Sequence, residues 1–156
     1  MSKKSQHPIY VFDLDGTLSV HDPTGRVRFL NQQPKDWKAF HAAAEIEIVN
    51  DPPREDIITL LRDIAETPTG PSIYIITGRS EKYRVQTQQW LQKHDIPYDD
   101  LFMRGLDDFR QDAIIKSEII ESFKHLIICV FEDRDQCVAM YRELGITCCQ
   151  VDEGAF

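Results

Sequence analysis

The chain has 156 residues, of which 42% are hydrophobic, 28% charged and 10% aromatic. This composition excludes collagen-like, low-complexity and wholly disordered chains. The 18 basic and 26 acidic residues give a net charge of −8, so the chain as a whole cannot act as an electrostatic sleeve for nucleic acid. Because no apolar run suits a membrane span or a signal peptide, we expect one soluble, cytoplasmic domain over residues 1–156, with a flexible tail at residues 1–8.

The first predicted elements are a strand, an irregular insertion and a helix. Residues 9–12 form a short apolar run that stops at Asp13, which is typical of a buried strand ending in a loop. Residues 19–53 show turn chemistry and room for one short helix within 35–44, so this insertion is too short for a second domain. Pro52-Pro53 then opens a helix with apolar residues at helical spacing up to Ile64.

The rest of the chain alternates strands with helices. Strands are predicted at 72–76, 101–103, 126–131 and 146–151, and helices through Trp90 and Leu91, at 112–123 and at 137–144. This alternation predicts an α/β fold in which a doubly wound parallel sheet is covered by helices on both faces. The sequence shows no internal repeat, linker or large cap domain.

Cysteines and aromatic residues are expected to be structural. The four cysteines are Cys129, Cys137, Cys148 and Cys149, and they contain no C-x-x-C pair. Buried reduced thiols are therefore favoured over a metal site or a disulfide. Trp37, Phe40 and Tyr83 could stack on a base, but core packing is the preferred interpretation.

Polar residues follow the predicted strands at the point where each strand ends. They are Asp13 and Asp15 after the first strand, Thr77 after the second, Lys116 near the start of the helix after the third, and Glu132 and Asp133 after the fourth. Ligands of doubly wound sheets bind outside these carboxyl ends, near the point where strand order reverses. The sequence therefore predicts one site assembled from four loops.

The acidic residues suit a hard cation. Asp13 and Asp15 can turn the same way on either side of Leu14, and two carboxylates so placed repel each other unless a cation such as Mg²⁺ lies between them. Asp133 or Glu132 can complete the ligand set, leaving positions for water and a phosphate oxygen.

The other residues suit phosphoryl transfer, which depends on positioning and charge neutralisation. The Thr77 hydroxyl and the Gly78 N–H can donate to phosphate at a helix N-terminus, and Lys116 supplies a positive charge. Asp13 is our candidate nucleophile and Asp15 our candidate acid and base. Gly16 lets the loop turn away, and Thr17 can fix it.

These residues also carry a resemblance to a known family. Phe12 to Leu18 (FDLDGTL), Ile76 to Arg79 (ITGR), Lys116 and Phe131 to Arg134 (FEDR) resemble, in order, the four motifs of haloacid-dehalogenase-like (HAD) phosphatases. Residues 83–91, 101–104, 112–118 and 134–156 look like the phosphatase domain of phage and bacterial polynucleotide kinase-phosphatases. The match covers the whole predicted domain and implies the Rossmann-like HAD fold, with three layers.

The resemblance implies a Mg²⁺-dependent phosphatase acting on 3′-phosphates of DNA or RNA ends or of nucleotides. It places Arg79 in the site, and it favours Arg26 as a further site arginine, with Arg28 as a rival. The family usually has two aspartates where this chain has Glu132-Asp133, so we assign direct metal contact to Asp133 and a water-mediated or indirect role to Glu132.

Several alternatives stay open. The ATP-binding motif G-x-x-x-x-G-K-[ST] is absent, so a kinase or ligase partner would be a separate chain. The runner-up function is a small-molecule nucleotidase, which the acidic net charge favours. A receiver-like phosphoacceptor is disfavoured because the aspartate pair follows the first strand, and a catalytically dead binding module because no proposed catalytic position is missing.

Overall fold

Five parallel strands form the sheet of the computed structural model, which describes residues 7–154. The strands are β1 (Ile9–Phe12), β2 (Ser72–Ser80), β3 (Asp100–Arg104), β4 (Ile127–Glu132) and β5 (Cys148–Gln150). They lie in the order β3-β2-β1-β4-β5, so the chain moves outward to β3 and then crosses to the other side of β1. The reversal of strand order therefore falls between β1 and β4, and the predicted doubly wound sheet is confirmed.

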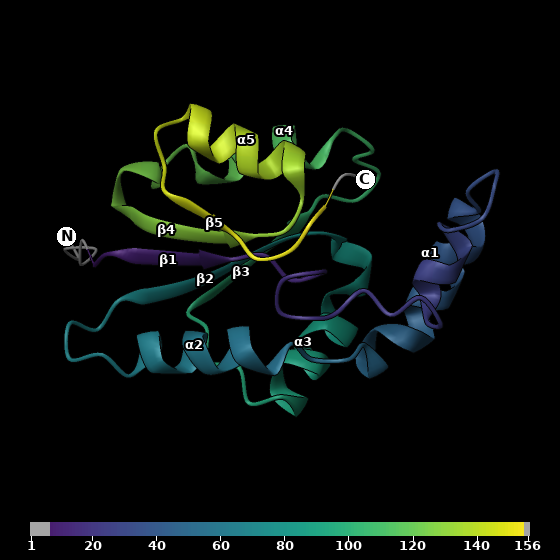
Figure 1. Ribbon diagram of the computed structural model, residues 1–156, viewed down its shortest axis with the longest axis horizontal. Helices are drawn as coiled ribbons and strands as arrows, with labels where there is room; N and C mark the ends of the chain where they lie inside the picture. Colours follow the sequence, from purple (N-terminus) through teal and green to yellow (C-terminus); the bar gives the residue numbers. More distant parts are fainter. Residues whose placement is uncertain (1–6, 155–156) are drawn as a thin grey trace.

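Helices cover both faces of the sheet (Figure 1). α2 (Glu55–Ala65) and α3 (Arg84–Lys93) lie on one face, and α4 (Asp112–Ile120) and α5 (Asp135–Glu143) on the other. Alternate strand residues supply the two cores, as the period of a strand requires: Phe12 packs in the core of the first face and Val11 in that of the second. Trp90 of α3 and Tyr141 of α5 are the largest fully buried side chains.

The insertion between β1 and α2 forms a separate lobe at the right of Figure 1. It holds η1 (Arg26–Phe29), α1 (Trp37–Glu47) and η2 (Ile48–Asn50). Ala44 and Ile48 pack on Tyr83, whose hydroxyl donates to the His41 carbonyl at 2.9 Å. Tyr83 precedes α3 in the short turn η3 (Glu81–Tyr83), so these contacts fix the insertion to the α3 side of the sheet.

Helix boundaries differ from the prediction where local hydrogen bonds decide them. α1 begins at Trp37 because the Asp36 carboxylate caps the helix by accepting from Ala39 N. α2 begins only at Glu55, since Pro53 is engaged in a bridge with Ser19. α4 ends at Ile120 and is followed by the turn η4 (Lys124–Leu126).

Three sequence expectations need correction. β2 continues through Ser80, because Ser80 still pairs with Arg104 of β3 after a register shift. Trp37 is 53% exposed and does not join the core, although Tyr83 does. Cys149 is exposed on the edge strand β5, whereas the other three cysteines are buried and all four are free thiols.

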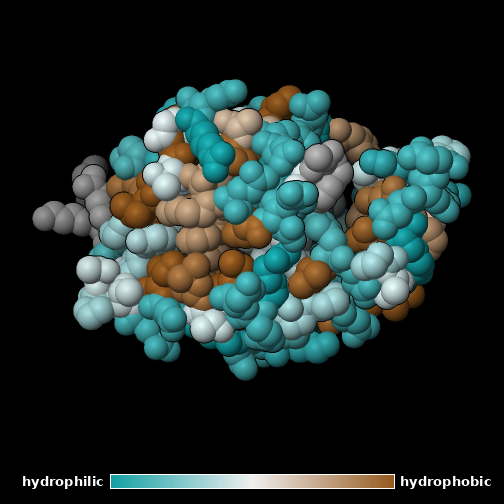
Figure 2. All heavy atoms as spheres, viewed as in Figure 1, coloured by the Kyte–Doolittle hydropathy of each residue, from teal (hydrophilic) through white to brown (hydrophobic). Residues whose placement is uncertain are grey.

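Hydrophilic residues cover most of the face shown in Figure 2, with smaller hydrophobic areas between them. Among residues 7–154, no helix is both long enough and apolar enough to cross a membrane.

Candidate active site

The loop after β1 is built to hold Asp13 in place. Asp13 N donates to the Phe131 carbonyl of β4 at 3.0 Å, which continues the pairing of the two strands. Leu14 and Leu18 are fully buried, and the Leu14 carbonyl accepts from Leu18 N and Ser19 N at 2.9 Å each. The apolar side chains and these bonds turn the chain sharply, so Asp13 lies at the end of the sheet.

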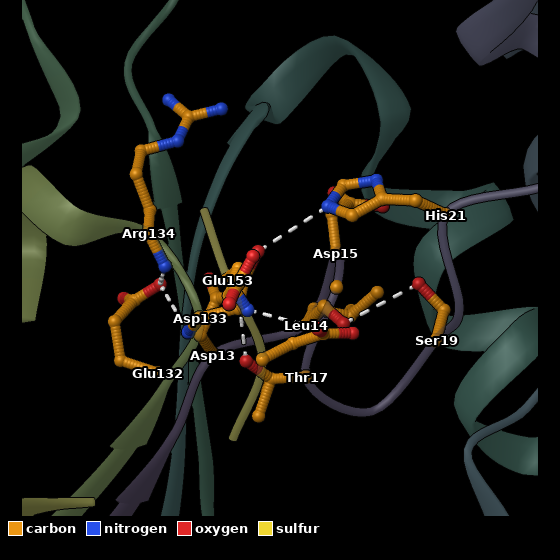
Figure 3. A network of polar contacts seen from close by, with 12 residues as sticks. Asp13, Leu14, Asp15, Thr17, Ser19, His21, Glu132, Asp133, Arg134 and Glu153 are labelled. Carbon is orange, nitrogen blue, oxygen red and sulfur yellow. Dashed lines mark hydrogen bonds and ion pairs between the residues drawn. The ribbon is translucent and has the colours of Figure 1, made fainter. Parts of the chain in front are cut away.

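Gly16 and Thr17 bring this loop against Asp133, and Figure 3 shows the contact of Thr17 with Asp133. Gly16 has a φ of +88°, and a Cβ there would overlap the Asp133 carboxylate and the His21 ring. The Thr17 hydroxyl donates to Asp133 Oδ1 at 3.3 Å, and His21 Nε2 lies 3.3 Å from Asp133 Oδ2. Only glycine permits this close approach without strain.

Lys116 reaches the loop from α4 and is almost fully buried. Its ammonium donates to Asp13 Oδ1 at 2.7 Å and to Glu132 Oε2 at 2.6 Å. Burial by itself would lower the pKa of Lys116, but the two carboxylates raise it well above its usual value. Lys116 is therefore a fixed positive charge between Asp13 and Glu132.

Glu132 accepts more and shorter hydrogen bonds than Asp133 does. Its Oε2 accepts from Lys116, and its Oε1 accepts from the backbone N–H groups of Asp133 and Arg134, both at 3.1 Å. Asp133 holds the loop contacts with Thr17 and His21 instead (Figure 3). Glu132 thus orients Lys116 and the start of the following turn.

The carboxylates at the end of β1 and β4 fit a divalent cation. Asp13, Glu132 and Asp133 are buried, and each offers an oxygen within 4.8 Å of the others. We name these three residues and Lys116 the carboxylate cluster. Three carboxylates and one ammonium sum to −2, which a divalent cation would neutralise, and carboxylate oxygens are the donors that Mg²⁺ prefers.

Asp15 does not join that cluster through its side chain, contrary to the expectation that it shares a cation with Asp13. Its Oδ1 accepts from Arg26 Nη2 at 2.7 Å and from Arg79 Nη2 at 2.6 Å, and its Oδ2 accepts from Arg79 Nε at 2.8 Å. Burial would raise the pKa of Asp15, but the two guanidinium groups hold it well below its usual range. The alternation around Leu14 is interrupted by the turn, which sends the two aspartates to different partners.

Asp51 completes this second group, which we name the arginine cluster: Asp15, Arg26, Arg79 and Asp51. Arg26 Nη1 donates to both oxygens of Asp51, and Arg79 Nη2 donates to Asp51 Oδ2 at 2.7 Å. Burial and the charge of Asp15 raise the pKa of Asp51 despite the two arginines. Sequence reasoning missed Asp51, since only its place before Pro52-Pro53 marks it.

The rival arginine has a different partner. Arg26 is buried, whereas Arg28 is exposed and pairs with Glu47 at 2.9 Å. The two residues point apart because η1 begins at Arg26 and turns the chain between them. The structure therefore brings Arg26, and not Arg28, to Asp15.

Thr77 and Gly78 lie on β2 and not at a helix N-terminus, which corrects the predicted setting. The Thr77 hydroxyl accepts from Arg79 N at 3.1 Å. A Cβ on Gly78 would overlap the Asp112 carboxylate, and Asp112 also accepts from Arg134 at 2.7 Å and from Arg104. His21, Asp112 and Arg134 are further polar residues around the site that sequence reasoning did not assign.

A cavity of about 270 Å³ opens beside Asp15 on the side of the insertion. Its walls include Asp15, Ser19, His21, Arg26, Asn50 and Asp51. The insertion therefore forms one wall of the site.

A family model of the polynucleotide kinase PNKP phosphatase domain matches residues 7–156. The chain belongs to this family. Membership confirms the resemblance seen in the motifs, and it confirms the prediction of a phosphatase enzyme at the level of the family.

Relatives of this phosphatase domain are longer proteins. A protein of Autographa californica nuclear polyhedrosis virus, named as a bifunctional polynucleotide kinase/RNA ligase, is 30% identical over 138 residues, which are 86% of this chain and 18% of the viral protein. A chain in a structure of the Pnkp1/Rnl/Hen1 complex is 30% identical, with a TM-score of 0.74, and matches 100% of this chain and 50% of its own length. The phosphatase domain thus spans half or less of the length of these relatives.

More distant structures share the fold. A HAD-family enzyme from Bacteroides thetaiotaomicron, solved as a magnesium complex, has a TM-score of 0.60 at 12% identity and covers 94% of this chain and 93% of its own. The predicted HAD fold is confirmed by such neighbours.

Proposed function

We propose that the protein is a Mg²⁺-dependent phosphomonoesterase that removes 3′-phosphates from nucleic-acid ends or nucleotides through an aspartyl-phosphate on Asp13. The observation that carries this proposal is the buried Asp13 at the end of β1, held by Lys116 at 2.7 Å and flanked by Glu132 and Asp133. A nucleophilic carboxylate needs such fixed neighbours, because phosphoryl transfer depends on positioning.

Asp13, Asp133 and, less directly, Glu132 would hold the metal ion. When bound, Mg²⁺ supplies neutralisation of charge on the phosphoryl group and around the carboxylates. The negative charge of Glu132 is balanced chiefly by Lys116 at 2.6 Å, whereas Asp133 makes only the longer 3.3 Å contacts with Thr17 and His21. This assignment makes Asp133 the better candidate for direct contact.

The reaction has two displacements. Lys116 contacts Asp13 Oδ1, so we assign the attack on phosphorus to Oδ2, which forms the new P–O bond while the bond to the leaving oxygen breaks. Asp15 is ionised between Arg26 and Arg79 when no substrate is bound. A bound phosphate that shares these guanidinium groups lets Asp15 take up a proton, and Asp15 gives this proton to that leaving oxygen. It then takes a proton from the water that attacks the phosphoryl group, which releases inorganic phosphate and restores the Asp13 carboxylate.

Arg26, Arg79 and the Thr77 hydroxyl are the proposed phosphate-binding groups, together with Gly78 N–H. Arg26 and Arg79 contact Asp15, which is two residues from the nucleophile, so their positive charges lie beside the reacting carboxylates. Guanidinium groups suit this role because their donors match phosphate oxygens.

Substrate and partners follow from the family and from the relatives. The names of the viral relative and of the Pnkp1/Rnl/Hen1 RNA repair complex refer to polynucleotide kinase, RNA ligase and RNA repair, which supports nucleic-acid ends as substrates. We propose that kinase and ligase steps are supplied by other segments or by separate chains. One domain over the matched residues remains our assignment.

A nucleotidase is the second candidate function. The net charge of −8 and the small cavity beside Asp15 favour a mononucleotide over a tracked strand. Salt separates the two functions, because a strand bound through its phosphates loses affinity as salt rises. A KM for oligonucleotides that does not change with salt would contradict strand tracking.

The direct test is phosphate release, with and without Mg²⁺, from matched 3′- and 5′-phosphorylated oligonucleotides and the corresponding mononucleotides. Asp13→Asn serves as the blank. We expect release from 3′ ends that requires Mg²⁺. Equal release from both ends, or release from mononucleotides alone, would favour the nucleotidase.

A further inference from the structure

Asp51 is the one carboxylate of the arginine cluster that the proposed reaction does not use. It lies in the insertion, yet its side chain is only 14% exposed. Two arginines assigned to the site, Arg26 and Arg79, both donate to it. A buried carboxylate is costly unless it is paired, so this placement calls for an explanation.

The main chain at Asp51 is tied to the core. Its carbonyl accepts from the indole Nε1 of Trp90 at 2.8 Å, and Trp90 is fully buried in α3. Its backbone also ends η2, whose residue Ile48 packs against Tyr83. Asp51 is therefore held rigidly, although the insertion carries it.

Each arginine bridges two carboxylates. Arg26 places Nη1 on Asp51 and Nη2 on Asp15, 2.7 Å from Oδ1. Arg79 Nη2 contacts the same two residues, while its Nε donates to Asp15 Oδ2 at 2.8 Å. Because two donors of a planar guanidinium are fixed at once, its plane is fixed too.

We propose that Asp51 is a positioning residue for the phosphatase reaction: it orients Arg26 and Arg79 so that both hold the Asp15 carboxyl group at the place where it exchanges protons with the leaving oxygen and the attacking water. This inference rests on the proposed function. Two carboxylates and two guanidinium groups give the arginine cluster a net charge of zero, and without Asp51 the charge becomes +1. The two guanidinium groups would then repel each other with only Asp15 between them.

The role predicts that kcat falls while KM does not rise. Removing the negative charge of Asp51 leaves the attraction for a phosphate dianion unchanged or stronger, so KM stays the same or falls. The orientation of Asp15 is lost, so kcat falls. Reduced folding alone would lower the amount of active enzyme without lowering KM.

The kinetic test compares Asp51→Asn with Glu45→Gln, which removes an exposed pair with Lys82 from the same insertion. We expect kcat to fall at least tenfold in Asp51→Asn with KM unchanged or lower, and no change in Glu45→Gln. Asp51→Glu keeps the charge but displaces the carboxylate, so its kcat should fall with KM unchanged. An unchanged kcat in both Asp51 variants, or a rise in KM without a fall in kcat, would overturn the inference.

A second measurement does not depend on turnover. The Nε–H of Arg79 donates to Asp15, so its hydrogen exchanges slowly with water, and its ¹⁵N NMR signal is assigned through Arg79→Lys. We expect this exchange to be at least tenfold faster in Asp51→Asn and Asp51→Glu than in wild type or Glu45→Gln. The same exchange rate in all four proteins would refute positioning by Asp51.

The two proposals fail separately. If the wild type releases no phosphate from any substrate while Arg79 Nε–H loses protection in the Asp51 variants, the function is wrong and the coupling of Asp51 to Asp15 stands. If the wild type is active and neither kcat nor exchange changes, only the role of Asp51 is wrong.

Discussion

The carboxylate cluster contains Asp13 and the arginine cluster contains Asp15, two residues further along the same loop. The two clusters nevertheless differ in net charge. The first combines Asp13, Glu132 and Asp133 with a single ammonium. The second pairs two carboxylates with two guanidinium groups. One cluster is left at −2 and needs a cation, whereas the other is neutral by itself.

Their structural supports differ as well. The carboxylate cluster stands on β1, β4 and α4, which belong to the sheet and its helical layer. The arginine cluster draws Arg26 and Asp51 from the insertion and only Arg79 from the sheet. A reactive group is thus fixed by the rigid core, while the groups around it depend on how the insertion docks.

The nucleophile gives the largest expected effect. Asp13→Asn removes the attacking charge but keeps the side chain's size, so we expect turnover to fall below one thousandth of wild type while the chain still folds. Phosphate release and circular dichroism measure the two effects. Asp22→Asn, in an exposed turn with Thr24, is the control, and appreciable activity in Asp13→Asn would remove Asp13 as nucleophile.

Substitution of Lys116 should have the next largest effect, because its ammonium is the only positive charge in the carboxylate cluster. Lys116→Met leaves buried carboxylates unpaired, which we expect to lower the free energy of unfolding by about 3–5 kcal/mol without Mg²⁺. Urea unfolding measures the loss. Lys124→Met, which removes an exposed pair with Glu121, should cost less than about 1 kcal/mol, and similar losses in both variants would contradict the distinct role of Lys116.

Gly16 tests the contact between the loop and Asp133. Gly16→Ala combines a positive φ with an overlap at the Asp133 carboxylate, so we expect a loss of about 1–3 kcal/mol in unfolding free energy, together with reduced turnover. Gly105→Ala, where a Cβ meets nothing within 4 Å, is the matched control. Equal stability of the two variants would show that the loop moves freely away from Asp133.

Substitution of Asp133 tests whether Asp133 or Glu132, at the end of β4, contacts the metal ion directly. Asp133→Asn removes a proposed metal ligand, so we expect the Mg²⁺ concentration for half-maximal activity to rise at least tenfold, about 1.4 kcal/mol. Glu132→Gln is the comparison and should change this concentration less. An unchanged Mg²⁺ requirement in Asp133→Asn would transfer direct metal contact to Glu132.

Loss of the ion pair between Arg28 and Glu47 should have the smallest effect on activity. Both residues are partly exposed, and such pairs contribute about 0–1 kcal/mol. We expect Arg28→Ala to leave kcat and KM within twofold of wild type. A large loss of activity would restore Arg28 as the rival of Arg26.

Elements with strong periodicity or sharp punctuation could be predicted. The strand at residues 9–12 and the carboxylates after it follow from an apolar run that stops at Asp13, and β4 with Glu132-Asp133 repeats the pattern. Element boundaries that depend on single hydrogen bonds could not be predicted. Examples are the start of α1, which Asp36 caps, and the extension of β2 to Ser80. The exposure of Trp37 depends on which face of α1 meets the core. The hydrophobic pattern of this short helix did not determine that face.

The sequence by itself determined the α/β fold, the family motifs and the carboxylate residues, because strand ends and motif spacing are local properties of the chain. Only the tertiary structure decided that Asp15 pairs with arginines and that Arg26 and Asp51 join it. Those partners lie 11 to 64 residues apart in the chain, and their contact depends on Trp90 and Tyr83 holding the insertion. The docking of the insertion leaves no periodic pattern in the sequence, because it depends on single buried side chains that are far apart in the chain.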